Sequence, residues 1–139
     1  MKAEAVIHYR LTTHAGVVNL IQGRVHAGVL PQAPVYPCLV YRRVESRRVQ
    51  GVYTDPGYAF VRVQITCLAK TYEEIKDVAE QVRLALERYG SALTGTAIPT
   101  AEAGNVTVYD ITLGTEADAY EPVLDVFSHA VDFEVLHAE

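Results

Sequence analysis

The sequence is poor in cysteine, with only Cys38 and Cys67 in 139 residues. They lack the paired spacing of a zinc site or a redox motif, so neither kind of site is indicated. The two thiols could meet across neighbouring strands. We favour free, buried cysteines, because an unpaired cysteine behaves as a small hydrophobic residue. A reducing, cytoplasmic compartment fits this cysteine content.

Long hydrophobic runs are absent as well. No stretch approaches the roughly 20 apolar residues that a membrane-spanning helix needs, so no membrane partner is expected. The chain begins MKAEAVIHYRL, with charges at Lys2, Glu4 and Arg10. Such a start lacks the uninterrupted apolar core of a signal peptide.

Basic residues are outnumbered, with 12 Lys and Arg against 17 Asp and Glu and a net charge of −5. This balance argues against sequence-independent nucleic-acid binding, which relies on clustered Lys and Arg against phosphates. A sequence-specific nucleic-acid partner is not expected either. The length suits one domain over residues 1–139 and is sufficient for a hydrophobic core without metal or disulfide.

Catalytic and ligand-binding motifs are missing too. The chain has no P-loop, GxGxxG, GxSxG or CxxC motif, and its five histidines form no zinc-protease helix. An acidic cluster lacks the oxygen spacing of a calcium loop and is interpreted as a solvated turn: Glu116, Asp118, Glu121 and Asp125. His129 is interpreted as a hydrogen-bonded sheet histidine rather than a ligand. We therefore expect no catalytic residue, cofactor or metal.

The N-terminal third combines helix with a proline segment. Apolar spacing predicts helix over residues 1–22, with a kink at Thr13–Gly16 and a glycine cap at Gly23. A short strand could follow at Arg24–Val29. Three prolines between residues 31 and 37 then fix φ near −65° and favour extended neighbours. This proline segment is expected to be stiff and to end where a strand begins.

A second helix is predicted from Thr71 to Tyr89. Its first residues, TYEE, form a capping box in which Glu74 stands three residues after the Thr71 hydroxyl. Gly90 is expected to end it. Its apolar residues form one stripe at helical spacing: Ile75, Val78, Ala79, Val82, Ala85, Leu86 and Tyr89.

Four strands are predicted from alternating or branched apolar residues. The first two are Cys38–Arg48 and the segment YAFVRVQITCLAK. The third is marked by Val106, Val108 and Ile111, and its apolar alternation changes phase near Asp110. The last is Phe127–Val135. An Asp55-Pro56-Gly57 turn is expected between the first two. The fold class is therefore α+β: an antiparallel sheet of about four strands with helices packed on one face.

Positive charge is concentrated in one short stretch, at Arg42, Arg43, Arg47 and Arg48. Two interpretations have equal weight. The arginines either keep a strand edge soluble, or they dock against an acidic patch of a neighbouring copy. For the second interpretation the expected acidic partners are Glu116, Asp118 and Glu121.

Three passages together resemble one protein family: GVLPQAPVYPCLVYRRV, TYEEIKDVAEQVRLAL and ITLGTEADAYEPVLDVFSHAVDFEVLH. They are similar to the tail-completion, or tail-terminator, proteins of long-tailed bacteriophages, prophages and gene transfer agents. The resemblance covers about residues 5–137, and the segment Ser91–Gly104 departs most from it.

The resemblance implies a structural virion assembly protein without enzymatic activity or cofactor. Its copies would form a homo-hexameric ring that caps the tail tube, ends tube polymerisation and joins head to tail. The implied partners are the tail tube protein and a head–tail connector or stopper protein, with DNA passing through the ring lumen. The ring would sit at the neck-proximal end of the virion tail after assembly in the bacterial host cytoplasm. The proline segment would hold a rigid surface for ring contacts.

A different class of function stays open. The chain could be a small α+β enzyme or ligand-binding domain with a pocket between sheet and helix.

Overall fold

The structure is a computed structural model that describes residues 2–48, 57–89, 95–101 and 103–139. Its elements follow the order α1 (Lys2–Thr13), α2 (Ala15–Ile21), β1 (Val25–Ala27), β2 (Cys38–Arg48), β3 (Tyr58–Ala69), α3 (Tyr72–Leu86), β4 (Thr96–Thr100), β5 (Gly104–Glu121) and β6 (Val126–Ala138). None of these helices is long and apolar enough to cross a membrane. The turn predicted at Asp55 and Pro56 and the helix stop predicted at Gly90 lie outside the described residues.

The strands form one six-stranded sheet in the order β1-β2-β3-β6-β5-β4. All neighbours are antiparallel except β1 and β2, which run parallel. The α+β class is confirmed, but the expected count of about four strands is too low, and the sheet is not wholly antiparallel. The strands beyond these four are β1, which lies within the short strand expected at Arg24–Val29, and the short β4. Pro99 in β4 obscures its strand pattern, and proline is tolerated there because β4 is an edge strand.

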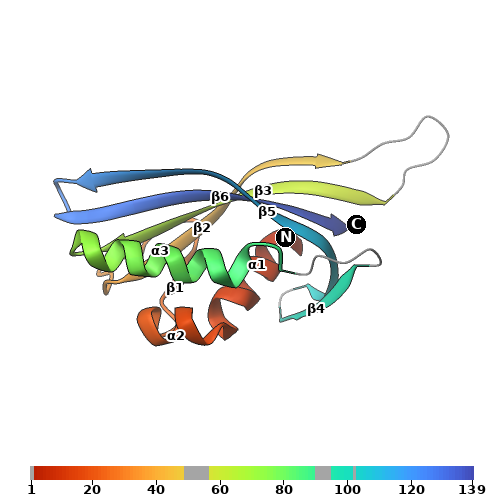
Figure 1. The fold of residues 1–139 in the computed structure, drawn as a ribbon, viewed down its shortest axis with the longest axis horizontal. Coiled ribbons are helices and arrows are strands. Elements are labelled where there is room, and N and C mark those ends of the chain that lie inside the picture. Colours follow the sequence, from red (N-terminus) through yellow and green to blue (C-terminus); the bar gives the residue numbers. More distant parts are fainter. Residues whose placement is uncertain (1, 49–56, 90–94, 102) are drawn as a thin grey trace.

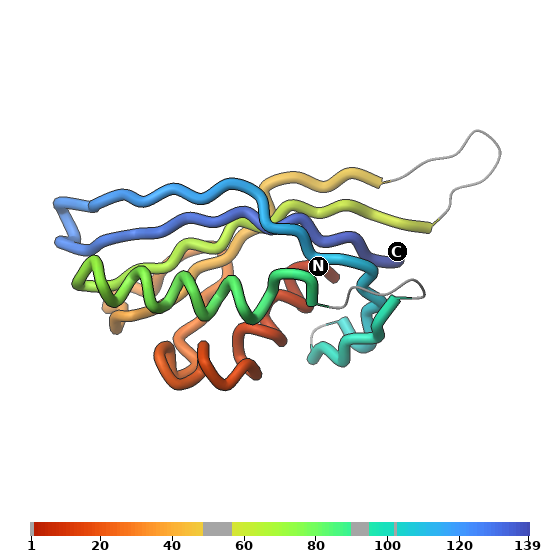
Figure 2. The backbone as a smooth tube through the Cα atoms, viewed as in Figure 1, coloured from red at the N-terminus to blue at the C-terminus, as the bar shows by residue number. Residues whose placement is uncertain are grey.

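All three helices cover the same face of the sheet and leave the other face open (Figure 1). Figure 2 shows α3 running along the sheet, with α1 and α2 beneath it. The core between them contains the predicted alternating residues of β3, which are buried together with the apolar stripe of α3. On β6 the partners directly opposite are also buried, as in the pairs Val63–Phe133 and Ile65–Val131. The predicted packing of this helix on this sheet face is therefore confirmed.

The start of α3 is confirmed by its cap, because the Thr71 side chain accepts a hydrogen bond from the Glu74 backbone N–H at 3.2 Å. The helix ends at Leu86, three residues before the predicted end. There the chain turns toward β5: Arg88 has a φ of +61°, and its N–H donates to the Ile111 carbonyl at 2.9 Å. Pairing with the sheet thus ends the helix early.

The longest strand, β5, corrects the interpretation of the acidic cluster. Glu116, Asp118 and Glu121 lie within β5, opposite β6, and the turn contains only residues 122–125. Acidic residues have low strand propensity, so the local sequence favoured a turn. The apolar alternation of β6 provides a long partner and extends the pairing through them. A register shift between Val108 and Asp110 confirms the predicted phase change.

Both cysteines are fully buried and free. Cys38 pairs with Leu68, whereas Cys67 pairs with Leu39. Because successive residues in a strand point to opposite faces, the two thiols lie on opposite faces of the sheet. The expectation of buried free cysteines is confirmed, and burial raises the pKa of the Cys38 thiol to about 11.

The predicted kink in the N-terminal helix is also confirmed, since α1 and α2 break at His14. Gln22 adopts the left-handed conformation at the end of α2, one residue before the predicted cap at Gly23, which has a φ of +79°. The proline segment then leads directly to the start of β2 at Cys38, as the sequence predicts.

Replacing Val82 by Asp tests the helix–sheet packing. Val82 on α3 is 0 % exposed, so the new carboxylate would be buried without a partner and should cost several kcal/mol, enough to unfold a domain of about 5–15 kcal/mol stability. The matched control is Leu84→Asp on the same helix, where the side chain is 50 % exposed. Thermal unfolding followed by circular dichroism should show loss of the transition for Val82→Asp only. An unchanged midpoint would refute the packing.

Candidate assembly surface

The sheet has two long stretches of edge strand on opposite sides of the molecule (Figure 1). On β2, β1 pairs only with residues Leu39–Tyr41, so no described strand lies beside Arg42–Arg48 on that side. On β5, β4 pairs only as far as Val108, and no described strand lies beside Thr112–Glu121. We call Arg42–Arg48 the basic edge and Thr112–Glu121 the acidic edge.

The basic edge holds all four arginines that the sequence singled out. The register with β3 places Arg42 and Arg47 on the open face of the sheet, whereas Arg43 and Arg48 lie on the face that the helices cover. A β-bulge at Val44 separates the two pairs. Bulges and positive charges are both found on edge strands that resist indiscriminate pairing.

Among the described residues, contacts within the chain occupy only part of the guanidinium groups of Arg42, Arg47 and Arg48. Arg42 Nε donates to Gln64 Oε1 at 3.2 Å, the Arg47 guanidinium lies 4.8 Å from the ring centre of Phe60, and Arg48 Nε lies 3.1 Å from Glu139 Oε1. Exposed pairs of this kind contribute about 0–1 kcal/mol each. A guanidinium carries five N–H donors, so the described contacts leave donors of these three arginines for an external partner.

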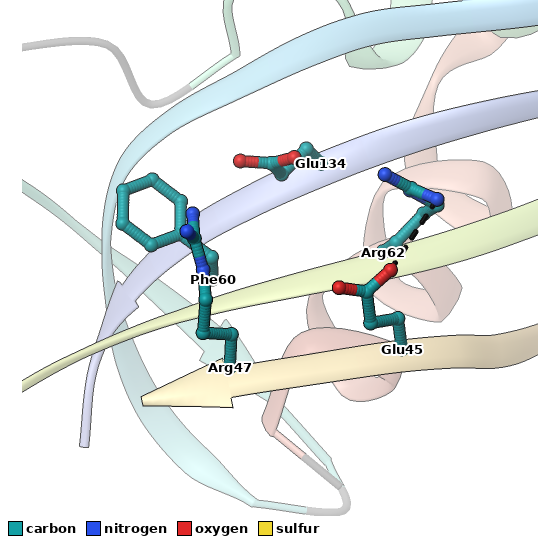
Figure 3. Close-up of a pocket in the computed structure, with 5 residues that line it drawn as sticks. All are labelled: Glu45, Arg47, Phe60, Arg62 and Glu134. Atoms are coloured by element: carbon teal, nitrogen blue, oxygen red, sulfur yellow. Dashed lines mark ion pairs between the residues drawn. The ribbon is translucent and has the colours of Figure 1, made fainter. Parts of the chain in front are cut away.

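A shallow hollow lies on the open face beside the basic edge (Figure 3). It is lined by Glu45, Arg47, Phe60, Arg62 and Glu134. Arg62 Nη1 lies 3.4 Å from Glu45 Oε2, and the Arg47 guanidinium rests over the aromatic ring. The hollow therefore contains two arginines and two carboxylates, a balanced set of charges.

The acidic edge is anchored to the helix layer through Asp118. Its Oδ2 atom lies 2.5 Å from Lys76 Nζ and accepts a hydrogen bond from the Tyr72 hydroxyl at 3.2 Å. Its Oδ1 atom lies 2.5 Å from His129 Nδ1. The hydrogen bonds from Lys76 and then His129 lower the pKa of Asp118 to about 2, and the same contact raises the pKa of Lys76.

His129 is buried between two carboxylates of the acidic edge. Its Nε2 atom lies 3.3 Å from Glu116 Oε1, in addition to the contact with Asp118. The interpretation of His129 as a hydrogen-bonded sheet histidine is confirmed. The sequence analysis missed the identity of its partners, because the pairing of Asp118 with His129 becomes visible only in the register of β5 on β6.

The structure gathers the predicted site residues into two groups and keeps the groups apart. The arginines share one edge, and the acidic residues share the other, with β3 and β6 between them. At about 4.8 Å per strand, three strand spacings separate the edges by roughly 14 Å across the sheet, and the two groups are also displaced along the strands by about six residues, or roughly 20 Å. Along these edges, the two groups could thus meet only between different copies of the chain. The basic group is Arg42, Arg43, Arg47 and Arg48, and the acidic group is Glu116, Asp118 and Glu121.

Acid should reveal the contribution of Asp118 to stability. Its folded pKa of about 2 lies below the ordinary 3.8, so its stabilising contribution is present above pH 3.8 and is lost as the pH falls toward 2. Its side chain is 34 % exposed, which limits the contribution to about 1 kcal/mol. We expect Asp118→Asn to lower the free energy of unfolding by that amount at pH 7 and by less at pH 2.5.

Urea denaturation at the two pH values measures this difference. Glu121→Gln is the control, because the Glu121 carboxylate contacts only the turn backbone, at the N–H of Val123, among its described hydrogen bonds. Equal unfolding free energies for wild type and Asp118→Asn at pH 7 would contradict the assignment.

Comparison with known proteins identifies relatives of this fold. A chain of a solved structure titled "Virion of native gene transfer agent (GTA) particle" superposes with a TM-score of 0.68 at 14% sequence identity, covering 100% of this chain and 95% of that chain. No curated protein matches the chain. The family model described as "Tail completion protein gp17" matches residues 5–138. Because this match spans nearly the whole sequence, the chain belongs to the tail completion protein gp17 family.

Proposed function

We propose that this protein caps the end of a phage tail tube as a homo-hexameric ring, ends tube polymerisation and presents a surface for head–tail joining. The observation that carries the proposal is the family match over residues 5–138, which makes the chain a structural component of a phage tail. Its partners are then further copies of itself, the tail tube protein and a head–tail connector or stopper protein. It acts at the neck-proximal end of the tail after assembly in the host cytoplasm, and DNA passes through the ring lumen.

The distribution of charge supports a ring. The basic and acidic edges lie on opposite sides of one sheet, so a contact between them uses two different surfaces of the same chain. Such heterologous contacts form closed rings when the rotation between copies closes. We assign the subunit interface to Arg42, Arg43, Arg47 and Arg48 of one copy and Glu116, Asp118 and Glu121 of the next.

The proline segment supports the same role. Leu30 and Tyr36 pack against a small buried cluster of Cys38, Leu68 and Val126 on the open face, which anchors the segment. Val29, by contrast, is left exposed. A surface that is already fixed loses less conformational freedom on assembly, which favours ring contacts.

The alternative, a small enzyme or ligand-binding domain with a pocket between sheet and helix, has less support. Val63 and Phe133 on the sheet and Val82 and Leu86 on α3 are all fully buried in one cluster. The space between α3 and the sheet is therefore filled by side chains, and a pocket that remains between sheet and helix lies at the start of α1, where Glu4, Arg48 and His137 are among its lining residues. On the family match we propose a structural role, without catalytic activity or cofactor.

Charge reversal at the basic edge tests the assignment. Arg47→Glu with Arg48→Glu should leave the fold intact, because both side chains are exposed, while weakening every subunit contact of the ring. We expect folded protein that fails to cap, giving tails of abnormal length that do not join heads. Tail length by electron microscopy in a complementation assay measures this, with folding checked by circular dichroism.

The matched control reverses two basic residues of the helix layer, Arg83→Glu in α3 with Arg88→Glu just after it, whose described ion pairs are with Glu80, Glu87 and Asp110 and not with either edge. This variant has the same net charge and should cap normally. Wild-type assembly should also weaken with salt, since the Debye length falls from about 10 Å at 0.1 M to about 3 Å at 1 M. Normal tails from the folded Arg47→Glu/Arg48→Glu protein would leave the arginines with a solubility role only.

A further inference from the structure

The two edges can bind a partner through backbone hydrogen bonds as well as through charged side chains. Each carries outward-facing N–H and C=O groups beside which no described strand lies. Backbone polar groups that become buried need hydrogen-bond partners, and an open strand edge is a template for another strand. A ring that buries these edges must therefore satisfy their backbone.

The direction of the strands favours one way of doing so. β2, β3, β6 and β5 are neighbours in the sheet, and each is antiparallel to the next. β5 consequently runs opposite to β2. When rotation places a second copy beside the first with its helices on the same side, the acidic edge of one meets the basic edge of the next in antiparallel orientation. Antiparallel pairing is the slightly more stable arrangement per residue.

Charge disfavours the other pairings. Basic edge against basic edge would bring the arginines of two copies together, and acidic edge against acidic edge would do the same for carboxylates. Like charges directly opposite each other destabilise a pair of strands. The occupant of each edge that the observations favour is thus the opposite edge of a second copy.

We propose that Arg42–Arg48 of one copy pairs with Glu116–Glu121 of the next as adjacent antiparallel strands, in the register that sets Arg48 opposite Glu116 and Arg42 opposite Glu121. The inference rests on the proposed ring and specifies how its subunits join. The bulge at Val44 removes one residue from the ladder, so both segments supply the same number of pairing positions.

Side-chain faces agree with this register. Arg48 and Glu116 both lie on the helix-covered face, and Arg42 and Glu121 both lie on the open face. Asp118 falls opposite Ser46 on the helix-covered face, with an arginine diagonally on either side. Opposite charges at directly facing positions stabilise a pair of strands.

The residues at the ends of the two segments are also consistent with this register. Pro122 follows Glu121 and has no N–H to donate, so the ladder ends there. On the other strand, β1 already occupies the position next to Tyr41, just before Arg42. The exposed tip after Pro122, where Val123 is 88 % exposed, then lies near the neighbour's Val29, which is 77 % exposed. Two exposed apolar groups would cover each other.

The proposed register also determines how far the strands tilt from the ring axis. Within one chain, Arg48 is level with Ala59, whereas Glu116 is level with Ile65 through Val131. The proposed pairing therefore offsets neighbouring copies along the strand direction by about six residues, or about 20 Å at 3.3 Å per residue. Four strands span about 19 Å at 4.8 Å each, so the strands would tilt by about 45° from the ring axis. Closed sheets have typical tilts of 35–45°.

Disulfide trapping with Arg47→Cys and Ala117→Cys in one chain tests the register. The proposal places these two positions directly opposite each other on the open face. Capped tails assembled with the variant and oxidised with copper phenanthroline should give a ladder of covalent multimers on a non-reducing gel. The native cysteines are fully buried and should not contribute, as wild-type protein will show. Tails assembled from a mixture of the two single-cysteine variants should give dimers only.

The control combines Ser46→Cys with Ala117→Cys, which point to opposite faces and should not cross-link. Glu45→Cys with Ala119→Cys, the next open-face pair in the same register, serves as a second rung if the first variant folds poorly. A ladder from either designed pair and none from the control supports the edge pairing. Normal capped tails without cross-links from both designed pairs would overturn it while leaving the capping role intact. Tails assembled with the wild-type protein that never contain the chain would overturn the capping function, and the edge pairing with it.

Discussion

The antiparallel pairing of β3 with β6 is the constraint on which the rest of the structure depends. Its register runs without interruption from Tyr58 opposite Ala138 to Ala69 opposite Phe127. Alternate residues of both strands turn their apolar side chains to one face, where α3 covers them. Slipping this register by one residue would expose the whole apolar set, so the pairing is strongly specified.

This central pair also determines what the molecule can present to others. Because β3 and β6 occupy the interior of the sheet, the outer strands β2 and β5 fall on opposite sides. Both continue beyond the short strands that cover them, β1 and β4. The charges differ on the two sides, with arginines on β2 and carboxylates on β5. The proposed ring needs two different, complementary surfaces, and the basic and acidic edges are the candidates for them.

The carboxylates of the acidic edge make contacts within the chain and are also the proposed contacts for a neighbouring copy. Asp118 receives hydrogen bonds from Lys76 and Tyr72 of α3 and contacts His129 of β6, so it ties the β5–β6 hairpin to the helix layer. That internal network neutralises part of the negative charge of the acidic edge. Glu121, at the end of β5 near the turn, is exposed, and its carboxylate accepts a hydrogen bond from the Val123 N–H. A neighbouring copy would therefore meet a rigid edge with a reduced negative charge.

The sequence by itself determined the elements whose pattern is local. The Thr71 capping box, the alternation of β3, the limits of β2 and the burial of both cysteines all follow from residue type and spacing. Tertiary structure decided what depends on distant partners. Pairing with β6 makes strand of residues that were expected to form an acidic turn. The early end of α3 accompanies the contact of Arg88 with Ile111, and β4 pairs with the edge that β5 provides. Strand pairing joins residues far apart in the chain, so no local pattern encodes which edges are left open.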